Sequence, residues 1–468
     1  MTINVLPDEA LLEIFAHYVD QAKRIGAWYT LVHVCGRWRS IVFSSTNRLH
    51  LQILCTARTP VRSSLDVWPA LPIAISDHRL SNVTLSGLDN IIATLKHHDR
   101  VHHIELWGFT SSLFGRFAAV MQEPFPELTY LELLSGGRSA APLNLPDSFL
   151  GGSAPQLQRL HLKGIPCPPI LKLLLSAINL VNADLWNIPH SGYISVEMLV
   201  TCLAAMTNLK SFSLGFRSPR SCPDPTSRRP PPLTRPVLPA LTHFKYRGVS
   251  ESLEDLVARI ETPLLGNTEI TFFNQLIFVI PQLTQFIRRV NKFKLFDQAV
   301  VLFQYRYVQV RLSPRSETVD PAILKLKISC KMSEWQLSSL AQLCNRSLSS
   351  CSTVERLNIR EDQYSQPHWQ DDIEHAQWID LLHPFTAVKD LYLSKELVPR
   401  VALALQEPIG ETEVLPMLQN IFLEWPRPSR LVREVIGPFI TARQSSDHPV
   451  TVHYWEEGGW VVHASGGR

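Results

Sequence analysis

A short apolar pattern recurs along most of this 468-residue chain. In each copy, three apolar residues are separated first by two positions and then by one. Well-formed copies begin at Val101, Leu128, Leu157, Leu209, Leu241, Val354, Val388 and Leu418. Weaker copies begin at Leu80, Leu180, Val290 and Ile323. Because alternate residues of a strand share one face, the last two apolar positions of each copy predict a short, half-buried strand.

The spacing between copies carries more weight than any single copy. Apolar residues make up 45% of the chain, so one copy would arise by chance in about one window in eleven. From residue 80 to residue 241 successive copies lie 21 to 32 residues apart, and the last three lie 34 and 30 residues apart. Repeats of this length, with one strand and one helix in each, are typical of leucine-rich repeats.

Proline and the segments between copies support the same interpretation. Pro126, Pro155, Pro239 and Pro416 each stand two residues before a copy, where proline ends the preceding helix before the ladder hydrogen bonds of the strand begin. Helix-like apolar spacing follows at residues 170–175, 198–203 and 253–260. We therefore predict an α/β fold in which residues 80–440 form an irregular solenoid with a parallel sheet on its concave face.

Polar residues that alternate with the apolar ones would project from the open face of that sheet. We predict that a target protein binds there through Glu132, His161, Lys163, Ser213, Lys245 and Tyr392. For any one of these residues, an ordinary solvated position is an equally good interpretation. The well-placed strands carry no dense arginine cluster of the kind that binds phosphopeptides, so the chemistry of the target stays open.

Three segments depart from the repeat. Residues 216–240 are rich in proline and arginine, which predicts an insertion without packed structure rather than a ligand for aromatic-grooved domains. Residues 265–320 are rich in aromatic residues and predict an irregular, strand-rich segment. Residues 441–468 alternate near their end and turn at Gly458-Gly459, which predicts a hairpin that caps the solenoid.

The N-terminal 55 residues follow a different, purely helical pattern. Pro7 in a first turn, with acidic residues after it, predicts a helix that begins there. Leu11, Ile14, Phe15 and Tyr18 form one apolar stripe on this helix, and a second apolar set comprises Leu31, Val34, Cys35, Trp38, Ile41 and Val42. Since so short a unit hides little of its apolar surface, we expect a partner to cover the remainder.

The blocks Leu6-Pro7-Asp8-Glu9, Ile14-Phe15 and Val34-Cys35-Gly36-Arg37-Trp38-Arg39 occur in the order found in an F-box, which the N-terminus resembles. An F-box is a helical module that docks on the adaptor Skp1 and thereby joins a cullin-based ubiquitin ligase. The resemblance implies a three-helix F-box at 1–55 and a linker at 56–79. It also implies adaptor contacts by Leu6, Pro7, Leu11, Ile14, Phe15, Val34, Cys35 and Trp38. Two ordinary helices that pack onto the rest of the protein are the alternative.

Two positions depart from the F-box pattern. Gly36 stands where the family usually has arginine or lysine, and Leu49-His50 stands where it often has Leu-Trp. Both departures would loosen the adaptor contact. Near the other end, residues 378–394, 401–406, 414–424 and 439–444 resemble the divergent F-box families of mushroom-forming fungi. This second resemblance implies a substrate receptor that binds a Skp1-like adaptor, and through it a cullin, together with an unassigned target.

Charge and cysteine content exclude several other classes of protein. A net charge of +3 is too small for a nucleic-acid footprint. The N-terminus lacks a signal-peptide pattern and no apolar run approaches about 18 residues, so we expect neither secretion nor a membrane span, but a cytoplasmic or nuclear protein. The eight cysteines are scattered, which predicts reduced thiols rather than zinc or disulfides. His97-His98 and His102-His103 predict a polar loop before a strand.

The sequence contains none of the common catalytic or phosphate-binding motifs. Asp371, Asp372 and Glu374 cluster beside Trp369 and His375, a composition that is more typical of a solvated surface than of an acid–base pair. We therefore expect a non-catalytic protein without cofactor or metal. Three alternatives stay open: a repeat scaffold that binds partners without a ligase, a structural protein, and a hydrolase.

Overall fold

The structure is a computed structural model. It describes residues 6–22, 26–59, 65, 68–136, 143, 145–166, 170–189, 194–219, 235–273, 275, 277–315, 322–330, 332–362, 369, 375–406, 413–424, 430–445 and 448–455. The chain divides into two compact units, Met1–Leu209 and Lys210–Arg468. In both units, short strands alternate with helices.

The first unit begins with three helices: α1 (Asp8–Ala22), α2 (Trp28–Val32) and α3 (Gly36–Ser44). Helix α1 starts directly after Pro7, as the sequence predicted. Arg37 on α3 ties the start of α1 in place, because its guanidinium donates to Asp8 Oδ1 at 2.9 Å and to the carbonyl oxygen of Leu6 at 2.6 Å.

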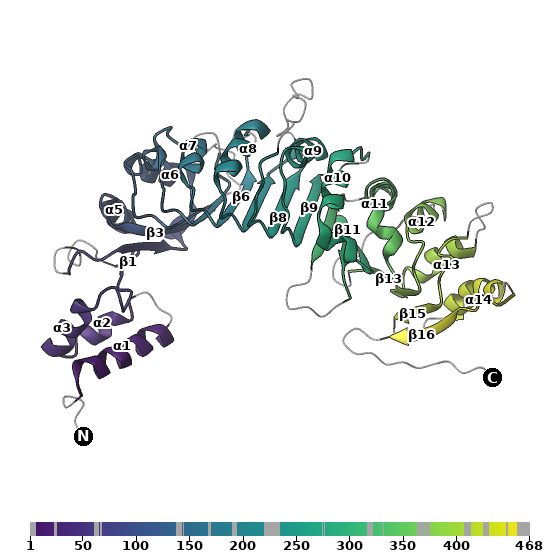
Figure 1. The fold of residues 1–468 in the computed structure, drawn as a ribbon, viewed down its shortest axis with the longest axis horizontal. Helices are drawn as coiled ribbons and strands as arrows, with labels where there is room; N and C mark the ends of the chain where they lie inside the picture. Colours follow the sequence, from purple (N-terminus) through teal and green to yellow (C-terminus); the bar gives the residue numbers. More distant parts are fainter. Residues whose placement is uncertain are drawn as a thin grey trace. The chain divides into compact units, whose positions relative to one another are not determined.

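Parallel strands in chain order make up the sheet of the first unit. They are β1 (Ile53–Cys55), β2 (Ile73–Asp77), β3 (Val101–Phe109), β4 (Tyr130–Ser135), β5 (Arg159–Lys163) and β6 (Asn182–Ile188). Between them lie α5 (Leu85–Leu95), α6 (Ser111–Val120), α7 (Leu171–Ser176) and α8 (Val196–Ala205). Figure 1 shows these helices on one side of the strands. Thr84, Thr110 and Ser195 cap α5, α6 and α8 by accepting a backbone N–H three residues later.

The sheet of the second unit runs in the order β7-β8-β9-β12-β11-β10-β13-β14-β15-β16. The strands are β7 (Ser211–Phe216), β8 (His243–Gly248), β9 (Asn267–Phe273), β10 (Gln298–Gln304), β11 (Tyr307–Ser313), β12 (Ile323–Ser329), β13 (Arg356–Glu361), β14 (Asp390–Leu393), β15 (Asn420–Glu424) and β16 (Thr451–Trp455). Strand β11 is antiparallel to both its neighbours, β10 and β12, whereas β9–β12 and β10–β13 are parallel pairs. The irregular segment expected at 265–320 thus contains one ordinary repeat strand, β9, then helical turns and the strands β10 and β11. The next strand, β12, lies just beyond this segment and pairs with β9.

Helices cover one side of this second sheet as well (Figure 1). They are α9 (Ser250–Ala258), α10 (Pro281–Arg289), α11 (Ser333–Ser347), α12 (His375–Leu382), α13 (Val398–Gln406) and α14 (Arg430–Ser445). The predicted fold class, an α/β solenoid of strand–helix repeats with a largely parallel sheet, is confirmed in both units. In strands β3 to β5 the alternating apolar residues are buried, as Leu131 and Leu133 of β4 are.

Each of the eight well-formed copies of the apolar pattern contains a strand. The weaker copies at Leu180 and Ile323 also contain strands, but those at Leu80 and Val290 do not. They lead instead into the 3₁₀ helices η2 (Leu80–Asn82) and η8 (Asn291–Leu295). The reason is that residues three apart share one face of a 3₁₀ helix, so the first half of the pattern suits either structure.

The expected boundary between linker and solenoid is wrong. Strands β1 and β2 belong to the sheet, although we placed β1 in the 1–55 module and β2 in the 56–79 linker. At the first apolar position of the pattern β1 has His50 and β2 has only the small residue Ala70, where the recognised copies have leucine, valine or isoleucine, which is why the sequence did not reveal these strands. The helices also contact the start of the sheet, since Trp28 Nε1 donates to the carbonyl oxygen of Gln52 at 2.9 Å.

The structure describes residues 441–445 and 448–455 of the C-terminal hairpin that was expected at 441–468. Residues 441–445 belong to α14, and β16 pairs in parallel with β15, so this stretch extends the sheet of the repeats. The second half of the expected hairpin, 456–468, and most of the proline-rich insertion, 220–234, lie outside the described residues. None of the described helices is long and apolar enough to cross a membrane. The six described cysteines, Cys35, Cys55, Cys202, Cys330, Cys344 and Cys351, are free thiols.

Candidate functional site

The N-terminal helices bury part of the apolar set that we expected a partner to cover. Leu11 and Phe15 are fully buried, and the ring of Phe15 packs against Trp38 on α3 with 4.6 Å between ring centroids. The expectation that Leu11 and Phe15 are accessible to an adaptor is therefore wrong. Helix α3 supplies the cover that we had assigned to a second protein.

Other members of the predicted adaptor set lie at the surface. Ile14 and Val34 expose 47% and 55% of their area, and Tyr18, one turn beyond Ile14 on α1, is also exposed. Pro7 is exposed, and Leu6, Cys35 and Trp38 are half-buried. The helical module therefore has an internal core of its own and still leaves large apolar side chains in contact with solvent.

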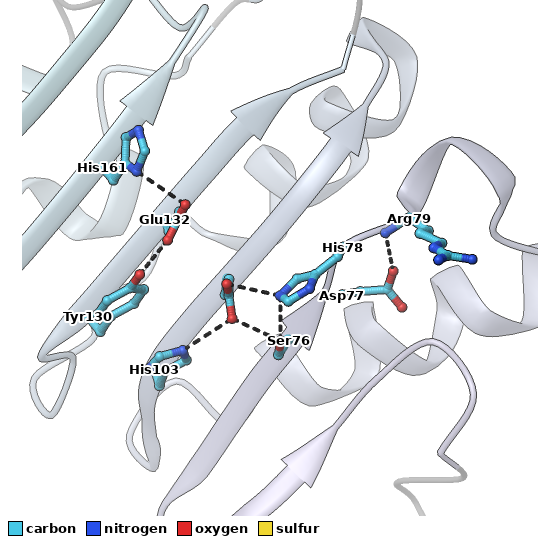
Figure 2. Close-up of polar contacts among 9 residues, drawn as sticks. Ser76, Asp77, His78, Arg79, His103, Tyr130, Glu132 and His161 are labelled. Atoms are coloured by element: carbon cyan, nitrogen blue, oxygen red, sulfur yellow. Dashed lines mark hydrogen bonds and ion pairs between the residues drawn. The ribbon is translucent and has the colours of Figure 1, made fainter. Parts of the chain in front are cut away.

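A row of polar residues crosses the sheet of the first unit from strand to strand. It comprises Ser76 on β2, Glu105 on β3, Glu132 on β4, His161 on β5 and Asp184 on β6, each opposite the next in the strand register. Neighbouring strands lie about 4.8 Å apart, so successive side chains of the row are within reach of one another. Figure 2 shows most of this row.

The predicted residues Glu132 and His161 meet in this row. His161 Nδ1 lies 3.1 Å from Glu132 Oε1, and its Nε2 lies 3.3 Å from Asp184 Oδ2. The Tyr130 hydroxyl donates to Glu132 from the same side of the sheet (Figure 2). Glu132 is buried by these neighbours, contrary to our expectation that it projects freely, whereas Lys163, two residues beyond His161 on β5, is exposed.

Ser76, His78 and Glu105 lie together at the start of the row. The Ser76 hydroxyl donates to Glu105 Oε2 at 3.0 Å, and Glu105 Oε1 lies 2.9 Å from His78 Nε2. Ser76 Oγ also lies 3.3 Å from that same nitrogen. Figure 2 draws this contact as a dashed line between Ser76 and His78. In a serine nucleophile relay, the hydroxyl and the carboxylate contact opposite nitrogens of the imidazole. Here both contact Nε2, so the cluster lacks the geometry of such a relay.

The histidines at 102 and 103 lie within β3 and not in a loop, which corrects the sequence interpretation. His102 Nδ1 is 2.9 Å from the carbonyl oxygen of Ile73, and the His103 ring stacks on Tyr130 with 4.2 Å between centroids. Burial lowers the pKa of both imidazoles, although Glu105 and Glu132 act in the opposite direction on His103. Burial therefore favours the neutral form of both rings.

A second row crosses the sheet of the other unit. Ser213 on β7, Lys245 on β8, Glu269 on β9, Lys325 on β12 and Arg311 on β11 lie opposite one another in register. A cleft of about 420 Å³ opens over this row. Its lining residues are Ser211, Ser213, His243, Phe244, Lys245, Asn267, Thr268, Glu269, Gln309, Arg311, Ile323 and Lys325. Ser213 and Lys245, both predicted from the sequence, are thus brought together.

Glu269 lies between two lysines in this cleft. Its carboxylate oxygens are 3.6 Å from Lys245 Nζ and 3.4 Å from Lys325 Nζ. The next row of the sheet places Arg247 and Lys327 on either side of Thr271. We call Lys245, Arg247, Glu269, Arg311, Lys325 and Lys327 together the cationic face.

Aromatic rings lie against Arg247 and Lys327, the two cations on either side of Thr271. The Arg247 guanidinium lies 5.1 Å from the centre of the Phe273 ring, and Lys327 Nζ lies 3.2 Å from the centre of the Tyr307 ring. Burial lowers the pKa of Arg247, and it lowers the pKa of Lys327 to about 8 with help from Lys325 and other nearby cations. An anion placed here would relieve this repulsion.

Tyr392 does not project freely from the sheet as we expected. Its side chain is buried, because its ring stacks on Phe422 of the next strand with 4.3 Å between centroids and 5° between planes. The guanidinium of Arg356 lies 5.4 Å from the Tyr392 ring centre on the preceding strand. Tyr392 therefore stabilises the packing of β14 against β15 by stacking on Phe422, and little of its side chain is exposed to a partner.

Sequence reasoning missed most of the cationic face. Arg311, Lys325 and Lys327 lie in segments whose strict alternation of apolar and polar residues is a clear strand signal. The pairing order of these strands was the missing information. The acidic cluster at Asp371, Asp372 and Glu374 lies outside the described residues. Within the described part of the chain, no group of three or more His, Cys, Asp or Glu side chains could hold a metal ion.

Comparison with known proteins adds little. No protein-family model matches the chain, and no curated protein matches it. Among solved structures, the leucine-rich repeat-containing protein LegL7 from Legionella pneumophila is similar, with 12% identity and a TM-score of 0.29 over 83% of this chain and 97% of that one. A likeness this weak carries no argument about function, and the fold assignment rests on the strand–helix repeats themselves.

Proposed function

We propose that this protein is the substrate-recognition subunit of a Skp1–cullin–F-box ubiquitin ligase. In this proposal the N-terminal helices dock on a Skp1-like adaptor, which connects them to a cullin, and the repeats bind a protein target. The chain itself makes and breaks no bonds. Its contribution is proximity, because a target held near a charged ubiquitin-conjugating enzyme has a raised effective concentration.

The observation that carries the proposal is the exposure of Ile14 and Val34 on a module whose core is already filled. Large apolar side chains in solvent are ordinary when they are scattered singly. Here they coincide with two of the positions at which the F-box resemblance places adaptor contacts, Ile14 on α1 and Val34 in the turn between α2 and α3. Such apolar anchors carry most of the binding energy of protein interfaces.

A non-catalytic role agrees with the geometry of the polar row in the first unit. Ser76, His78 and Glu105 bring a hydroxyl, an imidazole and a carboxylate together, but the hydroxyl and the carboxylate both contact the same imidazole nitrogen. The proposed role requires neither a cofactor nor a metal.

Adaptor capture tests the proposal. The full-length chain, immobilised through a tag, should retain purified fungal Skp1, and the variant Ile14→Ala/Val34→Ala should bind it at least about thirtyfold more weakly. The matched control is Ile178→Ala/Val237→Ala, which removes the same atoms from residues that are 53% and 48% exposed elsewhere on the chain. Equal capture by both variants and the unmodified chain would refute the proposal.

A repeat scaffold that binds its target without a ligase is the second candidate. It is favoured by Gly36, which departs from the F-box pattern, and by the burial of Leu11 and Phe15, which leaves fewer apolar contacts for an adaptor. This candidate predicts that the unmodified chain captures no Skp1 while its repeats still bind a protein partner.

A further inference from the structure

The four strands β8, β9, β12 and β11 carry an unbalanced set of charges. Their described residues include five cationic side chains, Lys245, Arg247, Arg311, Lys325 and Lys327, and one carboxylate, that of Glu269. The chain as a whole is nearly balanced, with 45 basic and 42 acidic residues. The excess on these strands is therefore a local feature of one surface.

These cations lie on the open side of the sheet. The alternate residues of the same strands, such as Tyr246, Ile270, Leu326 and Val310, are buried under the helices. The cleft of about 420 Å³ gives access to Lys245, Lys325 and Arg311 from solvent. Glu269 neutralises only part of the charge, because one carboxylate is shared by two lysines.

We infer that the cationic face binds an extended acidic segment of a protein partner, through several separate carboxylates. The inference rests on the target-binding half of the proposed function and states the chemistry of that target. It does not depend on the adaptor.

Charge complementarity identifies the occupant, and the spacing of the cations favours carboxylates over a single phosphate. From Lys245 on β8 to Arg311 on β11 the row spans three strand spacings, about 14 Å. A phosphoryl group is usually held by arginines that converge on one point. Three of the five cations here are lysines, each a point charge, with Lys245 on β8 and Lys325 and Lys327 two residues apart on β12. Such a spread array matches anions that are distributed along a chain.

The cleft also suits an extended segment in its shape. Its lining includes the polar row of Ser213, Lys245, Glu269 and Lys325, which an extended segment can follow from strand to strand. Phe273 and Tyr307 hold Arg247 and Lys327 in place beside it. The positive charges are thus positioned before a ligand arrives, which lowers the entropy lost on binding.

Fluorescence anisotropy of a labelled peptide of alternating glutamate and serine, titrated with the full-length chain, tests the inference. We expect the variant Lys325→Gln/Lys327→Gln to bind about tenfold more weakly. Glu269→Gln removes the competing carboxylate and should bind more tightly than the unmodified chain. The matched control is Lys292→Gln/Lys294→Gln, which removes two exposed lysines from η8, outside the sheet.

A further variant keeps the inference testable if Lys325→Gln/Lys327→Gln does not fold. Arg311 is exposed on β11, so Arg311→Gln should leave the fold intact and still weaken binding. The inference is overturned if the glutamate peptide does not bind, or if the η8 control loses as much affinity as the sheet variant. It is also overturned if a glutamine peptide with one phosphoserine, or a polyuridine oligonucleotide, binds more tightly than the glutamate peptide.

The adaptor experiment separates failure of this inference from failure of the ligase proposal. Lys325→Gln/Lys327→Gln should capture Skp1 as well as the unmodified chain does. Conversely, Ile14→Ala/Val34→Ala should bind the glutamate peptide normally. If the unmodified chain bound the glutamate peptide but captured no Skp1, the ligase proposal would be overturned and the inference of an acidic target would be supported.

Discussion

Lys327 on β12 lies over the ring of Tyr307 on the neighbouring antiparallel strand, with 3.2 Å from Nζ to the ring centre. The ring attracts the ammonium group, but its other surroundings oppose the charge. The charged groups around Lys327 are those of Lys325, Glu269, Arg247 and Lys245. Burial and the three cations outweigh Glu269, and they lower the pKa of Lys327 to about 8.

The affinity for an acidic peptide should therefore depend on pH just above neutrality. A bound carboxylate favours the ammonium form, so the pKa of Lys327 rises above about 8 in the complex. The affinity for the peptide is therefore at its full value below the pKa of the free protein, about 8, and weakens as pH rises from there through the higher pKa of the complex. Anisotropy titrations at a series of pH values measure this change. Lys327→Arg keeps its charge throughout, so an unchanged pH profile in that variant would exclude Lys327 as the cause.

The two kinds of apolar residue on α1 should behave oppositely when replaced. Phe15 is buried against Trp38, so Phe15→Ala should destabilise the helical module by about 3–5 kcal/mol. Ile14→Ala removes an exposed side chain and should change stability by less than about 0.5 kcal/mol, while it weakens adaptor capture. Urea unfolding followed by circular dichroism measures both variants. A large stability loss in Ile14→Ala would mean that Ile14 is a core residue.

The repeat could be predicted from the sequence because each strand carries its own local signal. Leu131 and Leu133 are buried as the pattern requires, and the proline before such a copy marks where the preceding segment ends. The pattern failed at Val290, where three-residue spacing suits a 3₁₀ turn equally well. It also missed β2, where the small residue Ala70 stands at the first apolar position of the pattern.

The candidate site was less predictable because it depends on strand order. The alternation in β11 and β12 is visible in the sequence, but nothing local shows that β12 pairs with β9 and so places Lys325 beside Glu269. Exposure was equally hard to infer. Tyr392 occupies a position that faces away from the core, yet stacking on Phe422 buries it. Register across strands, rather than sequence along them, decides both outcomes.

A glycine contact between β3 and the end of β4 gives a prediction about the first sheet. Gly108 has a φ of +77° at a register shift in β3, and a Cβ added to Gly136 would lie 2.6 Å from the Gly108 Cα. Gly136→Ala should therefore destabilise the protein by about 1–3 kcal/mol. Gly115 is exposed on α6 with open space around it, so Gly115→Ala should stabilise by about 0.5–1 kcal/mol. Thermal unfolding measures the melting temperatures of the Gly136→Ala and Gly115→Ala variants. Equal shifts in the two variants would refute the close contact between Gly108 and Gly136.

Glu361 at the end of β13 should make the protein less stable as pH rises. Burial raises the pKa of its carboxyl to about 7, with smaller contributions from Glu396 and Glu424, while Trp369 Nε1–H and Arg400 act in the opposite direction. In the unfolded chain this pKa is near 4.5, so between those two values the folded state holds a proton that the unfolded state has lost. Stability therefore falls as pH rises from 4.5 to 7 and stays lower above that range.

Replacing Glu361 with glutamine tests this linkage, because the amide oxygen can still accept the hydrogen bond from Trp369. Glu361→Gln should melt at a higher temperature than the unmodified chain in weakly alkaline buffer, and at nearly the same temperature near pH 4. Glu355→Gln is the control of opposite sign. The pKa of Glu355 is lowered by its hydrogen bond with Lys389 at 2.7 Å, so its stabilising effect is present at neutral pH and is lost in acid. If both variants shifted the melting temperature in the same direction at alkaline pH, the burial of Glu361 would not be the cause of the shift seen in Glu361→Gln.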